Sequence, residues 1–426
     1  MCSLSQYWQS FQQRLFPGIP ESTEGVYTER HRELMWVLDL VRLEGFVSAS
    51  GPALLGRPAL DRRPLARAFL AKAVFQLPTT EALRERLHVD RALRQLCGWE
   101  TRRAVPSAAT FSRAFAAFAR TGLLDQLHAH LVAQHLGEVL IWHVSRDSTA
   151  ITARERPQPR PAAGAASGPA AAPVAAPSAA AETAAAPVVT PSAAAETAVA
   201  PVVAPSAAAE TAAAAPVPAA PRRRGRRGRR RSPPDLSASE PTRLARQYAA
   251  GPAETERLLD ELPRVCDVGG KKNSQGHTEY WTGYKLHADV GDGGIPLLCV
   301  TTSASLHDSQ VAIPMARKTA QRVRSLYDLM DSAYDAGPIR QASLDLEHVP
   351  IIDANRRRGP APPPMEPDRA RRYDARSGSE RFNALLKDQY GGRTVRVRGA
   401  PKVHTHLMCG VVVIFAAVLQ GWAAAS

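Results

Sequence analysis

Up to residue 137 the apolar residues recur at the spacing of one helical face. The stretch "VPSAATFSRAFAAFARTGLL" (105–124) has an apolar stripe with a period near 3.6, made of Phe111, Phe115 and Phe118. Ser107 is a typical residue before a helix, and Gly122 is typical after one. The stretch "LPTTEALRERL" (77–87) starts in the same way, with Pro, then Thr, then Glu. The pattern predicts a region of several short helices.

Two arginines of this region lie off its apolar stripe. Arg113 and Arg120 should face outward on the helix that carries the three phenylalanines. Short helices with basic outer faces are typical of helix-turn-helix proteins that bind DNA. An ordinary helical bundle with solvated arginines has the same spacing, so the pattern alone leaves both interpretations open.

After residue 137 the pattern changes to short apolar runs bounded by turn residues. It predicts strands at 138–151, 280–290, 295–305, 325–335 and 349–355, and helices at 308–323 and 373–387. We expect the first strand to end near Asp147, and "GDGG" (291–294) to form the turn between the second and third strands. This alternation of strands and helices predicts an α/β fold with a mixed sheet.

Residues 157–221 interrupt the pattern. They are mostly Ala, Pro, Ser, Val and Thr, and "PSAAAETA" recurs with a period of 14 residues from position 177. The repeat has no large side chains to bury, which excludes a solenoid, and closely spaced Pro prevents a long helix. We expect a disordered linker, followed by an Arg run, "RRRGRRGRRR" (222–231), that adds non-specific DNA affinity.

The charge of the chain indicates an acidic partner. The net charge is +14 and the pI is near 10, but eight arginines lie in the run at 222–231, so the rest carries +6. This balance favours a partner such as nucleic acid, though less strongly than the pI alone suggests.

The cysteines and the apolar segments indicate the cellular compartment of the protein. The five cysteines are scattered without Cys-x-x-Cys spacing, which indicates a reducing cytosol and no zinc site. His277, His287 and His307 also lack the spacing of zinc ligands. The tail at 407–425 has only 13 strongly apolar residues before Gln420, which favours a buried helix or strand over a membrane span.

Three carboxylates stand at positions suited to a metal site. Asp147 ends the first predicted strand, Asp331 ends a later one, and Glu380 lies on the following helix. Such oxygen ligands suit Mg²⁺, and two ions ~4 Å apart activate an attacking oxygen and stabilise a leaving one in phosphodiester chemistry. An Asp after a strand is also a common turn or cap residue. Asp328 and Asp335 compete with Asp331, and the strand's alternation does not decide among them.

The segment "YDARSGSERFNALLK" (373–387) carries four spaced polar groups, Tyr373, Arg376, Glu380 and Lys387. If it is one regular helix, all four lie within an arc of roughly 60°. One carboxylate flanked by two cations and a phenol suits a face that lies against a polyanion. Gly378 supports an alternative, because it is costly inside a helix. It would then mark the first turn of a helix with Ser377 or Ser379 as its cap, and Tyr373 and Arg376 would precede that helix.

These four residues match Tyr-x2-Arg-x3-Glu-x6-Lys at every fixed position. The segment resembles the signature of the DDE transposases of bacterial insertion sequences, a cut-and-paste group with an RNase H-like core. "RDSTAI" resembles the strand of its first Asp, and "DSAYDA" its second motif, an Asp followed three residues later by Tyr, which selects Asp331. The stretch 56–99 resembles the group's N-terminal helical domain. The resemblance covers most of the chain outside the linker.

Two features depart from that pattern. The second motif usually has Gly before its Tyr, where this chain has Ala333, and Ala would not suit a loop that needs a positive φ. The Ala/Pro insertion after Asp147 is foreign to the group. The cost of closing a flexible insertion rises only slowly with its length, so the core can survive it.

The resemblance implies a chemistry and the residues that carry it. The three carboxylates would bind two Mg²⁺ ions, with Mn²⁺ as a substitute, that activate water to nick DNA at an element end. The freed 3′-hydroxyl would then attack target DNA. Arg376 and Lys387 would hold phosphates near the cut, and Tyr373 would pack against the DNA backbone. The implied partners are terminal inverted repeats, target DNA and a second copy of the chain on DNA, in the cytoplasm at the nucleoid, with no membrane.

We therefore expect an RNase H-like mixed sheet with flanking helices, an N-terminal all-α domain and a disordered insertion. The expected boundaries are 1–137 for the helical, DNA-binding region, 138–156 for the first catalytic strand, 157–234 for the linker and Arg run, and 235–426 for the rest of the catalytic domain. Two other functions remain compatible with the sequence. One is an RNase H-like nuclease that cuts DNA without strand transfer, and the other is an inactive DNA-binding relic.

Overall fold

The computed structural model describes residues 27–47, 60–157, 241–272, 275–355 and 363–425. The predicted linker, apart from its first residue, and the Arg run lie outside the described residues. The described residues on either side of that gap belong to one compact unit.

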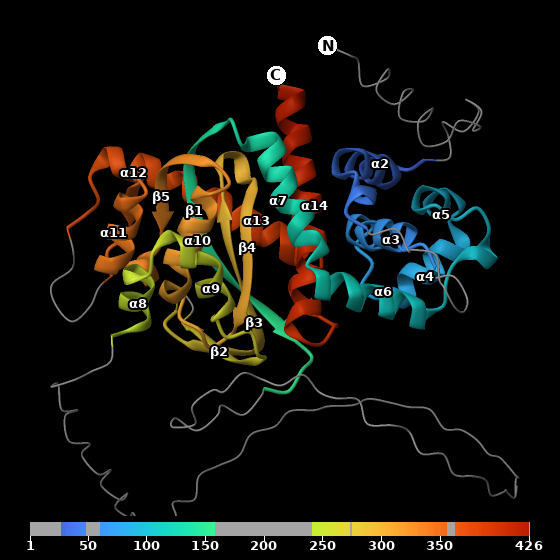
Figure 1. Cartoon of the computed structure of the whole chain (residues 1–426), viewed down its shortest axis with the longest axis horizontal. Coiled ribbons are helices and arrows are strands. Elements are labelled where there is room, and N and C mark those ends of the chain that lie inside the picture. The colour runs from blue at the N-terminus through green and yellow to red at the C-terminus, as the bar shows by residue number, and fades with distance from the viewer. Residues whose placement is uncertain (1–26, 48–59, 158–240, 273–274, 356–362, 426) are drawn as a thin grey trace, which may run out of the picture. The chain divides into compact units, whose positions relative to one another are not determined.

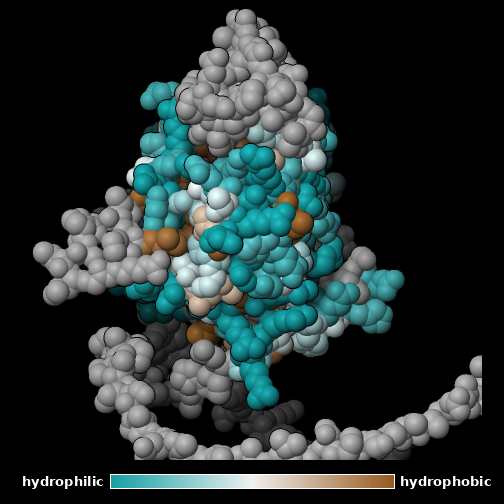
Figure 2. Space-filling model, turned by 90° about the vertical axis from the view of Figure 1, so that its right-hand side faces the viewer, coloured by the Kyte–Doolittle hydropathy of each residue, from teal (hydrophilic) through white to brown (hydrophobic). Residues whose placement is uncertain are grey.

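The N-terminal region is helical, as predicted. Its helices are α2 (Glu29–Val41), α3 (Arg63–Val74), α4 (Thr80–Val89), α5 (Arg91–Cys97), α6 (Ala108–Thr121) and α7 (Leu123–Leu136) (Figure 1). At the start of α6 the Ser107 hydroxyl accepts a hydrogen bond from the backbone N–H of Thr110, and Gly122 follows its last turn with a φ of 61°. The phenylalanine stripe is buried, whereas Arg113 and Arg120 are exposed. The face of the molecule in Figure 2 is mostly hydrophilic, with only scattered apolar residues.

Within the described residues, seven strands form one mixed sheet. They are β1 (Leu140–Ala153), β2 (Asp267–Lys272), β3 (Thr278–Val290), β4 (Pro296–Ser303), β5 (Arg324–Met330), β6 (Val349–Ile352) and β7 (Thr394–Val395). The central strand β1 pairs antiparallel with β3 and parallel with β5, and β6 extends the parallel side. β2 and β4 pair with successive halves of β3. The predicted α/β fold with a mixed sheet is confirmed.

The first strand is longer than predicted. The prediction ended it near Asp147, but β1 continues to Ala153. Parallel pairing with β5 stops at Arg146, whereas antiparallel pairing with β3 continues to Thr152 and β7 joins at the end. These partners lie far away in the chain, so the local pattern did not show them. Asp147 therefore lies at the point where β1 loses its parallel neighbour.

Helices cover both faces of the sheet. Those after the gap are α8 (Arg243–Ala249), α9 (Thr255–Asp260), α10 (Ser309–Ala320), α11 (Gly337–Asp345), α12 (Pro367–Tyr373), α13 (Ser377–Asp388) and α14 (Ala400–Ala425). Successive residues of β4 point to opposite faces. Leu297 and Cys299 join the core that contains α13 and α14, whereas Leu298 and Val300 pack with α9 and α10. The sheet thus separates two apolar layers.

The apolar C-terminal tail forms the long helix α14, which runs beside α7 in Figure 1. Among the described helices it is the one long and apolar enough to cross a membrane by length and composition, and 56% of that span is buried inside the protein. Val411, Val412 and Phe415 have no exposed surface, and Trp36 of α2 donates a hydrogen bond from Nε1 to the carbonyl of Ala416 at 3.3 Å. The tail at 407–425 was predicted to be a buried helix or strand, and it is a largely buried helix.

The signature segment is not one regular helix. α12 ends at Tyr373, a single 3₁₀ turn spans Asp374–Arg376, and α13 begins at Ser377. A 3₁₀ turn holds three residues instead of 3.6, so the predicted single arc over 373–387 is wrong in detail. As the alternative predicted, α13 starts after Tyr373 and Arg376, but the predicted serine cap is wrong, because Arg376 is the N-cap residue and no side chain caps the helix. Gly378 lies buried in the first turn of α13, where a Cβ would come within 3.7 Å of the Gly294 backbone.

Candidate active site

Asp147 and Asp331 occupy matched positions on neighbouring parallel strands. The last paired residues of β1 and β5 are Arg146 and Met330, and each Asp is the next residue of its strand's chain. Neighbouring strands lie about 4.8 Å apart, and residues in register point to the same face. The fold therefore brings together two carboxylates from opposite sides of the insertion.

Asp331 is held by the turn that follows β5. Its Oδ1 accepts a hydrogen bond from the backbone N–H of Ala333 at 2.9 Å, at the start of the 3₁₀ turn Ser332–Tyr334. The described non-glycine residues with positive φ are Arg42, Gln76 and Glu347. Ala333 is not among them, so this turn does not need the Gly that the family pattern usually has.

Asp328 and Asp335, the two competitors of Asp331, have other partners. Asp328 is buried and accepts a hydrogen bond from Ser343 at 2.7 Å, with His348 at 3.3 Å. Asp335 forms an ion pair with Arg340 at 2.9 Å. Both carboxylates have structural roles that the sequence did not reveal.

Arg376 contacts all three candidate carboxylates. Its Nη1 lies 2.8 Å from Glu380 Oε1, its Nη2 lies 3.3 Å from Asp147 Oδ1, and the same nitrogen lies 3.9 Å from Asp331 Oδ2. The side chain of Arg376 is 17% exposed and that of Glu380 is 63% exposed. The three acids thus surround a single guanidinium, for which the sequence left two interpretations open, a contact with DNA phosphate and a helical charge pair with Glu380.

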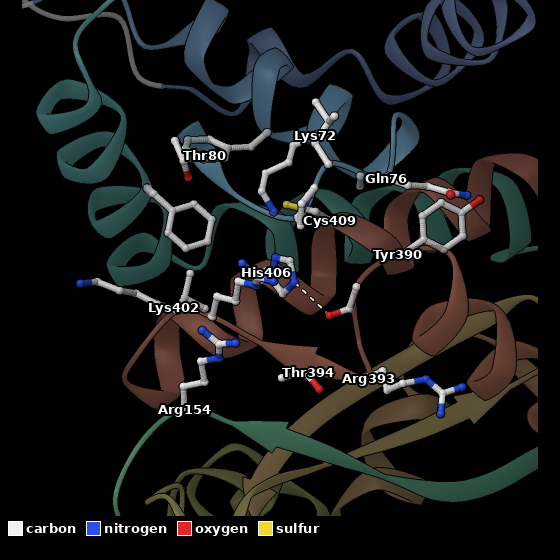
Figure 3. Close-up of a pocket in the computed structure, with 18 of the residues that line it drawn as sticks. Lys72, Gln76, Thr80, Arg154, Tyr390, Arg393, Thr394, Lys402, His406 and Cys409 are labelled. Atoms are coloured by element: carbon white, nitrogen blue, oxygen red, sulfur yellow. Dashed lines mark hydrogen bonds between the residues drawn. The ribbon is translucent and has the colours of Figure 1, made fainter. Parts of the chain in front are cut away.

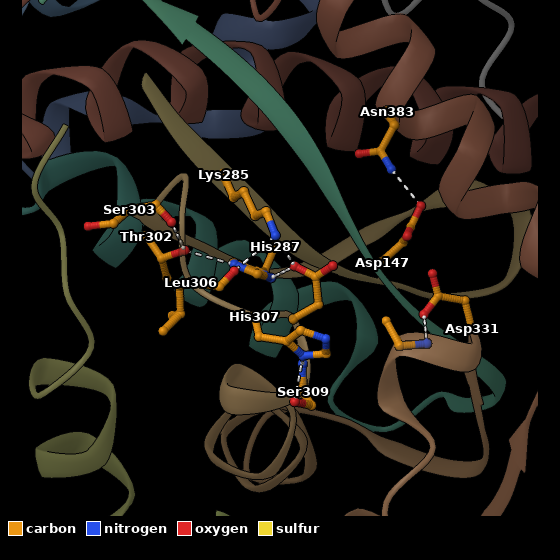
Figure 4. Close-up of polar contacts among 12 residues, drawn as sticks. Asp147, Lys285, His287, Thr302, Ser303, Leu306, His307, Ser309, Asp331 and Asn383 are labelled. Atoms are coloured by element: carbon orange, nitrogen blue, oxygen red, sulfur yellow. Dashed lines mark hydrogen bonds and ion pairs between the residues drawn. The ribbon is translucent and has the colours of Figure 1, made fainter. Parts of the chain in front are cut away.

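Asn383 is a site residue that sequence reasoning missed. It lies three residues after Glu380 on α13, and its Nδ2 donates a hydrogen bond to Asp147 Oδ2 at 3.0 Å (Figure 4). The i, i+3 spacing places both side chains on neighbouring parts of one helix face. That spacing is the signal in the sequence that could have found it.

Burial governs the protonation of the two aspartates. It raises the pKa of Asp147, and Arg376 opposes that rise while Asp331 adds to it. Burial also raises the pKa of Asp331, against the hydrogen bond from Ala333 and the charge of Arg376. Burial tends to lower the pKa of Arg376, but its carboxylate neighbours outweigh this and raise it. Positive charge at the centre of the site is therefore stabilising.

Three buried polar atoms beside the carboxylates have no hydrogen-bond partner among the described residues. They are Arg376 Nε, Asn383 Oδ1 and the hydroxyl oxygen of Tyr334. Tyr334 is the Tyr of the second motif, and its pKa is raised well above the usual value by burial and then by Asp308, Asp147 and Asp331. Unpartnered buried polar atoms are costly, so the site is suited to a polar or charged occupant.

The donor set fits a hard divalent cation. Asp147 and Asp331 offer carboxylate oxygens from adjacent strands, and Asn383 Oδ1 is an unpartnered oxygen beside them. No three His, Cys, Asp or Glu side chains in the described part of the chain already form a metal-binding group. The guanidinium of Arg376 lies among the carboxylates and supplies the positive charge there.

The other residues of the signature border the site. Burial raises the pKa of Tyr373 to about 12, with Arg376 acting in the opposite direction. Burial lowers the pKa of Lys387, and Lys271 and Arg393 lower it further. Asp147 influences both groups, which places them near its carboxylate.

Arg113 and Arg120 are not brought to this site. Both lie on the exposed face of α6, which packs against α3, α4, α7 and α14. Their predicted role in DNA binding stays a prediction.

A second polar cluster lies beside the carboxylates and was also missed. Lys285 Nζ contacts Asp308 Oδ1 at 2.9 Å, and His287 Nε2 lies 2.8 Å from the Thr302 hydroxyl (Figure 4). Burial would raise the pKa of Asp308, but His287 and Lys285 outweigh it and lower the pKa. His307 Nδ1 contacts the Ser309 hydroxyl at 2.8 Å at the start of α10. His287 and His307 thus each have a hydrogen-bonding partner in the protein.

Two family models match the chain. Residues 24–117 match one described as Transposase domain (DUF772), and residues 258–415 match one described as Transposase DDE domain. Together the two matches cover more than half of the chain. The chain belongs to the DDE transposases of insertion sequences. A search of curated proteins and a search of solved structures each found no significant match.

The two family matches contain only two of the three candidate carboxylates of this transposase. Asp331 and Glu380 lie within the matched DDE domain, whereas Asp147 lies between the two matches, on the strand that precedes the insertion. The sheet has the strand order and mixed directions of the RNase H-like fold. The family establishes DNA transposition as the function, and the roles of individual residues rest on geometry.

Proposed function

We propose that this transposase cleaves DNA at the ends of its element and joins the freed end to target DNA, with Asp147, Asp331 and Glu380 as ligands of divalent metal ions. The observation that carries the proposal is the placement of these three carboxylates around one guanidinium. Divalent ions held by these three carboxylates would lower the pKa of an attacking hydroxyl and neutralise charge on the leaving oxygen. Mg²⁺ is the expected ion because all the donors are oxygens.

The chain's own residues position the carboxylates and the DNA. Asn383 holds Asp147 through its amide N–H, and the turn after β5 holds Asp331 through the N–H of Ala333. Arg376 keeps an unpartnered Nε donor, which suits a phosphate oxygen, since arginine binds phosphate through several N–H groups at once. Lys387 and Tyr373 extend this surface along the helical segment. The guanidinium of Arg376 now occupies the space between the carboxylates, so it would have to move away for a metal ion to bind there.

Each region of the chain has its own role in this proposal. Residues 1–137 would bind DNA, 138–156 and 235–426 would form the catalytic domain, and 157–234 would be a linker between its first two strands. Two copies on paired element ends, in the cytoplasm, would complete the active assembly.

The test is cleavage of a supercoiled plasmid that carries the element's own ends, in the presence of Mg²⁺ or Mn²⁺. Asp147→Asn, Asp331→Asn and Glu380→Gln should each lower cleavage by at least about a hundredfold. Asp260→Asn is the matched control, because Asp260 is an exposed acid on the other side of the sheet. Full cleavage by any of the three variants removes that residue from the site.

Strand transfer separates the proposal from its alternatives. Joining of a pre-cleaved element end to a target plasmid is expected from a transposase and not from a nuclease that only cuts. Cleavage without joining would favour the nuclease. The absence of both activities with either metal would favour the DNA-binding relic.

A further inference from the structure

A cavity of about 810 Å³ lies away from the carboxylates, between the N-terminal helices and the C-terminal part of the chain. Its walls come from α3, α4 and α6 on one side and from the end of α13, β7 and α14 on the other (Figure 3). Both matched family domains therefore contribute to it.

Six cationic side chains line this cavity, namely Lys72, Arg154, Arg393, Arg396, Arg398 and Lys402. The acid in its lining, Asp388, forms an ion pair with Arg393. In the described part of the chain, the other five cations have no carboxylate partner within ion-pair distance. Their mutual repulsion makes an anionic occupant favourable.

The buried side of the cavity is also short of negative charge. Burial lowers the pKa of Lys72, and Arg396 lowers it further, although the thiol of Cys409 opposes this. Burial lowers the pKa of His406 to about 4, and Lys72 contributes to that shift. His406 is therefore neutral at pH 7 and adds no charge of its own. Lys72, His406 and Cys409 lie together in Figure 3.

The cavity connects to the carboxylate site through two elements. Along β1 and the residue that follows it, Arg154 is seven residues beyond Asp147, a distance of about 23 Å at 3.3 Å per residue. Along α13, Asp388 is eight residues beyond Glu380, or about 12 Å. Lys387 lies between the two sites, and the charge of Arg393 reaches it. A line of cations thus runs from Arg376 through Lys387 to the cavity.

We propose that this cavity binds the sugar-phosphate backbone of the DNA whose end lies at the carboxylates. A DNA strand carries one phosphate per 3.4 Å of rise, so phosphates about four to seven nucleotides from the cut would reach the cavity. The occupant must be both anionic and long enough to span the two sites, which DNA satisfies and a free phosphate does not. Because both domains line the cavity, the same DNA would hold them together. The proposal rests on the proposed function, because it takes DNA as the substrate and places the DNA end at the carboxylates.

The first test is the salt dependence of binding to a 30-base-pair duplex without divalent metal, so that no cleavage occurs. Arg396→Gln, Arg398→Gln and Lys402→Gln combined should reduce the slope of log Kd against log salt by about two to three, since each phosphate contact contributes about 0.9. The matched control combines Arg257→Gln, Lys318→Gln and Arg324→Gln on α9, α10 and β5. It removes the same net charge elsewhere. Equal slopes for the two triple variants would overturn the proposal.

A second test uses the unaltered protein and does not depend on the folding of a variant. Lys402 should react more slowly with an amine-specific reagent when the duplex is bound, by at least about threefold, whereas Lys318 should not change. Unchanged reactivity of Lys402 with saturating DNA would overturn the proposal. So would equal protection by inorganic phosphate alone, which would indicate a small-anion site. Neither test measures cleavage, so failure here leaves the assignment of the carboxylates intact, and the reverse also holds.

Discussion

Asp147 and Asp331 each lie one position past Arg146 and Met330, the last paired residues of the parallel strands β1 and β5. This relationship explains how a large insertion can be tolerated between them in the chain. The distance between the two carboxylates is set by the spacing of adjacent strands and not by the length of the connection. An insertion after β1 changes the connection only, provided that β3 and β5 still pair with β1.

Arg376 is expected to compete with metal ions in the absence of DNA. Replacing it with Gln removes a cation that contacts all three carboxylates, so Mn²⁺ should bind about threefold to tenfold more tightly to DNA-free protein. The affinity for duplex DNA should fall in the same variant, because a phosphate-binding donor is lost. Titration calorimetry with Mn²⁺ checks the first effect and a gel-shift assay the second.

Arg381→Gln is the control for this prediction. Arg381 is an exposed residue of the same helix, and its loss changes the net charge equally. Weaker Mn²⁺ binding by Arg376→Gln than by Arg381→Gln would show that Arg376 supports the metal site and does not compete with it.

The sequence revealed most where the signal was local. The start and end of α6 follow from Ser107 and Gly122, which act within one helical turn. β2, with the sequence "DVGGKK", was missed because its composition does not favour a strand, and its pairing comes from β3. Gly269 in β2 has a tertiary cause, since a Cβ there would lie 2.5 Å from the ring of Trp281.

The candidate site also has features that the sequence revealed and features that it did not. The three carboxylates and the signature residues were named from motifs. The contact of Arg376 with the acids, the hydrogen bond from Asn383 and the unpartnered hydroxyl of Tyr334 depend on where α13 crosses β1. That crossing is a long-range packing result, which spacing within one segment does not show.

The buried ion pair beside the site should be intolerant of single changes. Arg146 contacts Asp289 through two parallel interactions of 2.8 and 2.9 Å, and neither side chain is more than 1% exposed. Asp289→Asn removes the carboxylate that contacts the guanidinium and leaves Asp328 as the other buried acid near it, and should lower the free energy of unfolding by about 3–5 kcal/mol. Urea unfolding measures this loss.

A double variant tests the cause of that loss. Arg146→Met with Asp289→Leu should be more stable than Asp289→Asn alone, because the buried guanidinium is removed together with the carboxylate that contacts it. Asp368→Asn, at an exposed pair with Arg371, should leave stability unchanged. A double variant no more stable than the single one would argue against an unpaired charge as the cause.

Two adjacent leucines of α13 offer a matched test of its packing. Leu386 has no exposed surface and belongs to the main core, whereas Leu385 is 37% exposed. Leu386→Ala should lower the free energy of unfolding by about 2–5 kcal/mol, and Leu385→Ala by less than about 1 kcal/mol. Thermal and urea unfolding of the two variants provide the comparison. Similar losses would mean that α13 is not docked against the core as described.

His128 predicts part of the acid sensitivity of the fold. It is buried on α7, and its Nε2 donates a hydrogen bond to the carbonyl of Pro296 at 3.0 Å. Burial, assisted by Arg322, lowers its pKa from 6.5 to about 4. The unfolded chain therefore binds the proton more readily than the folded one. This stability is fully present above pH 6.5, is lost as the pH falls through about 4, and is about 3 kcal/mol at most.

His128→Gln isolates this contribution, because Gln keeps an N–H donor for the Pro296 carbonyl and does not titrate. His287 and His406, whose pKa values burial also lowers to about 4, remain in both proteins and cancel in the comparison. Unfolding free energies from urea titrations at pH 7.5 and pH 4.5 should show a larger acid loss in the wild-type protein than in the variant. Parallel pH curves for the two proteins would mean that His128 binds its proton equally well in the folded and unfolded states.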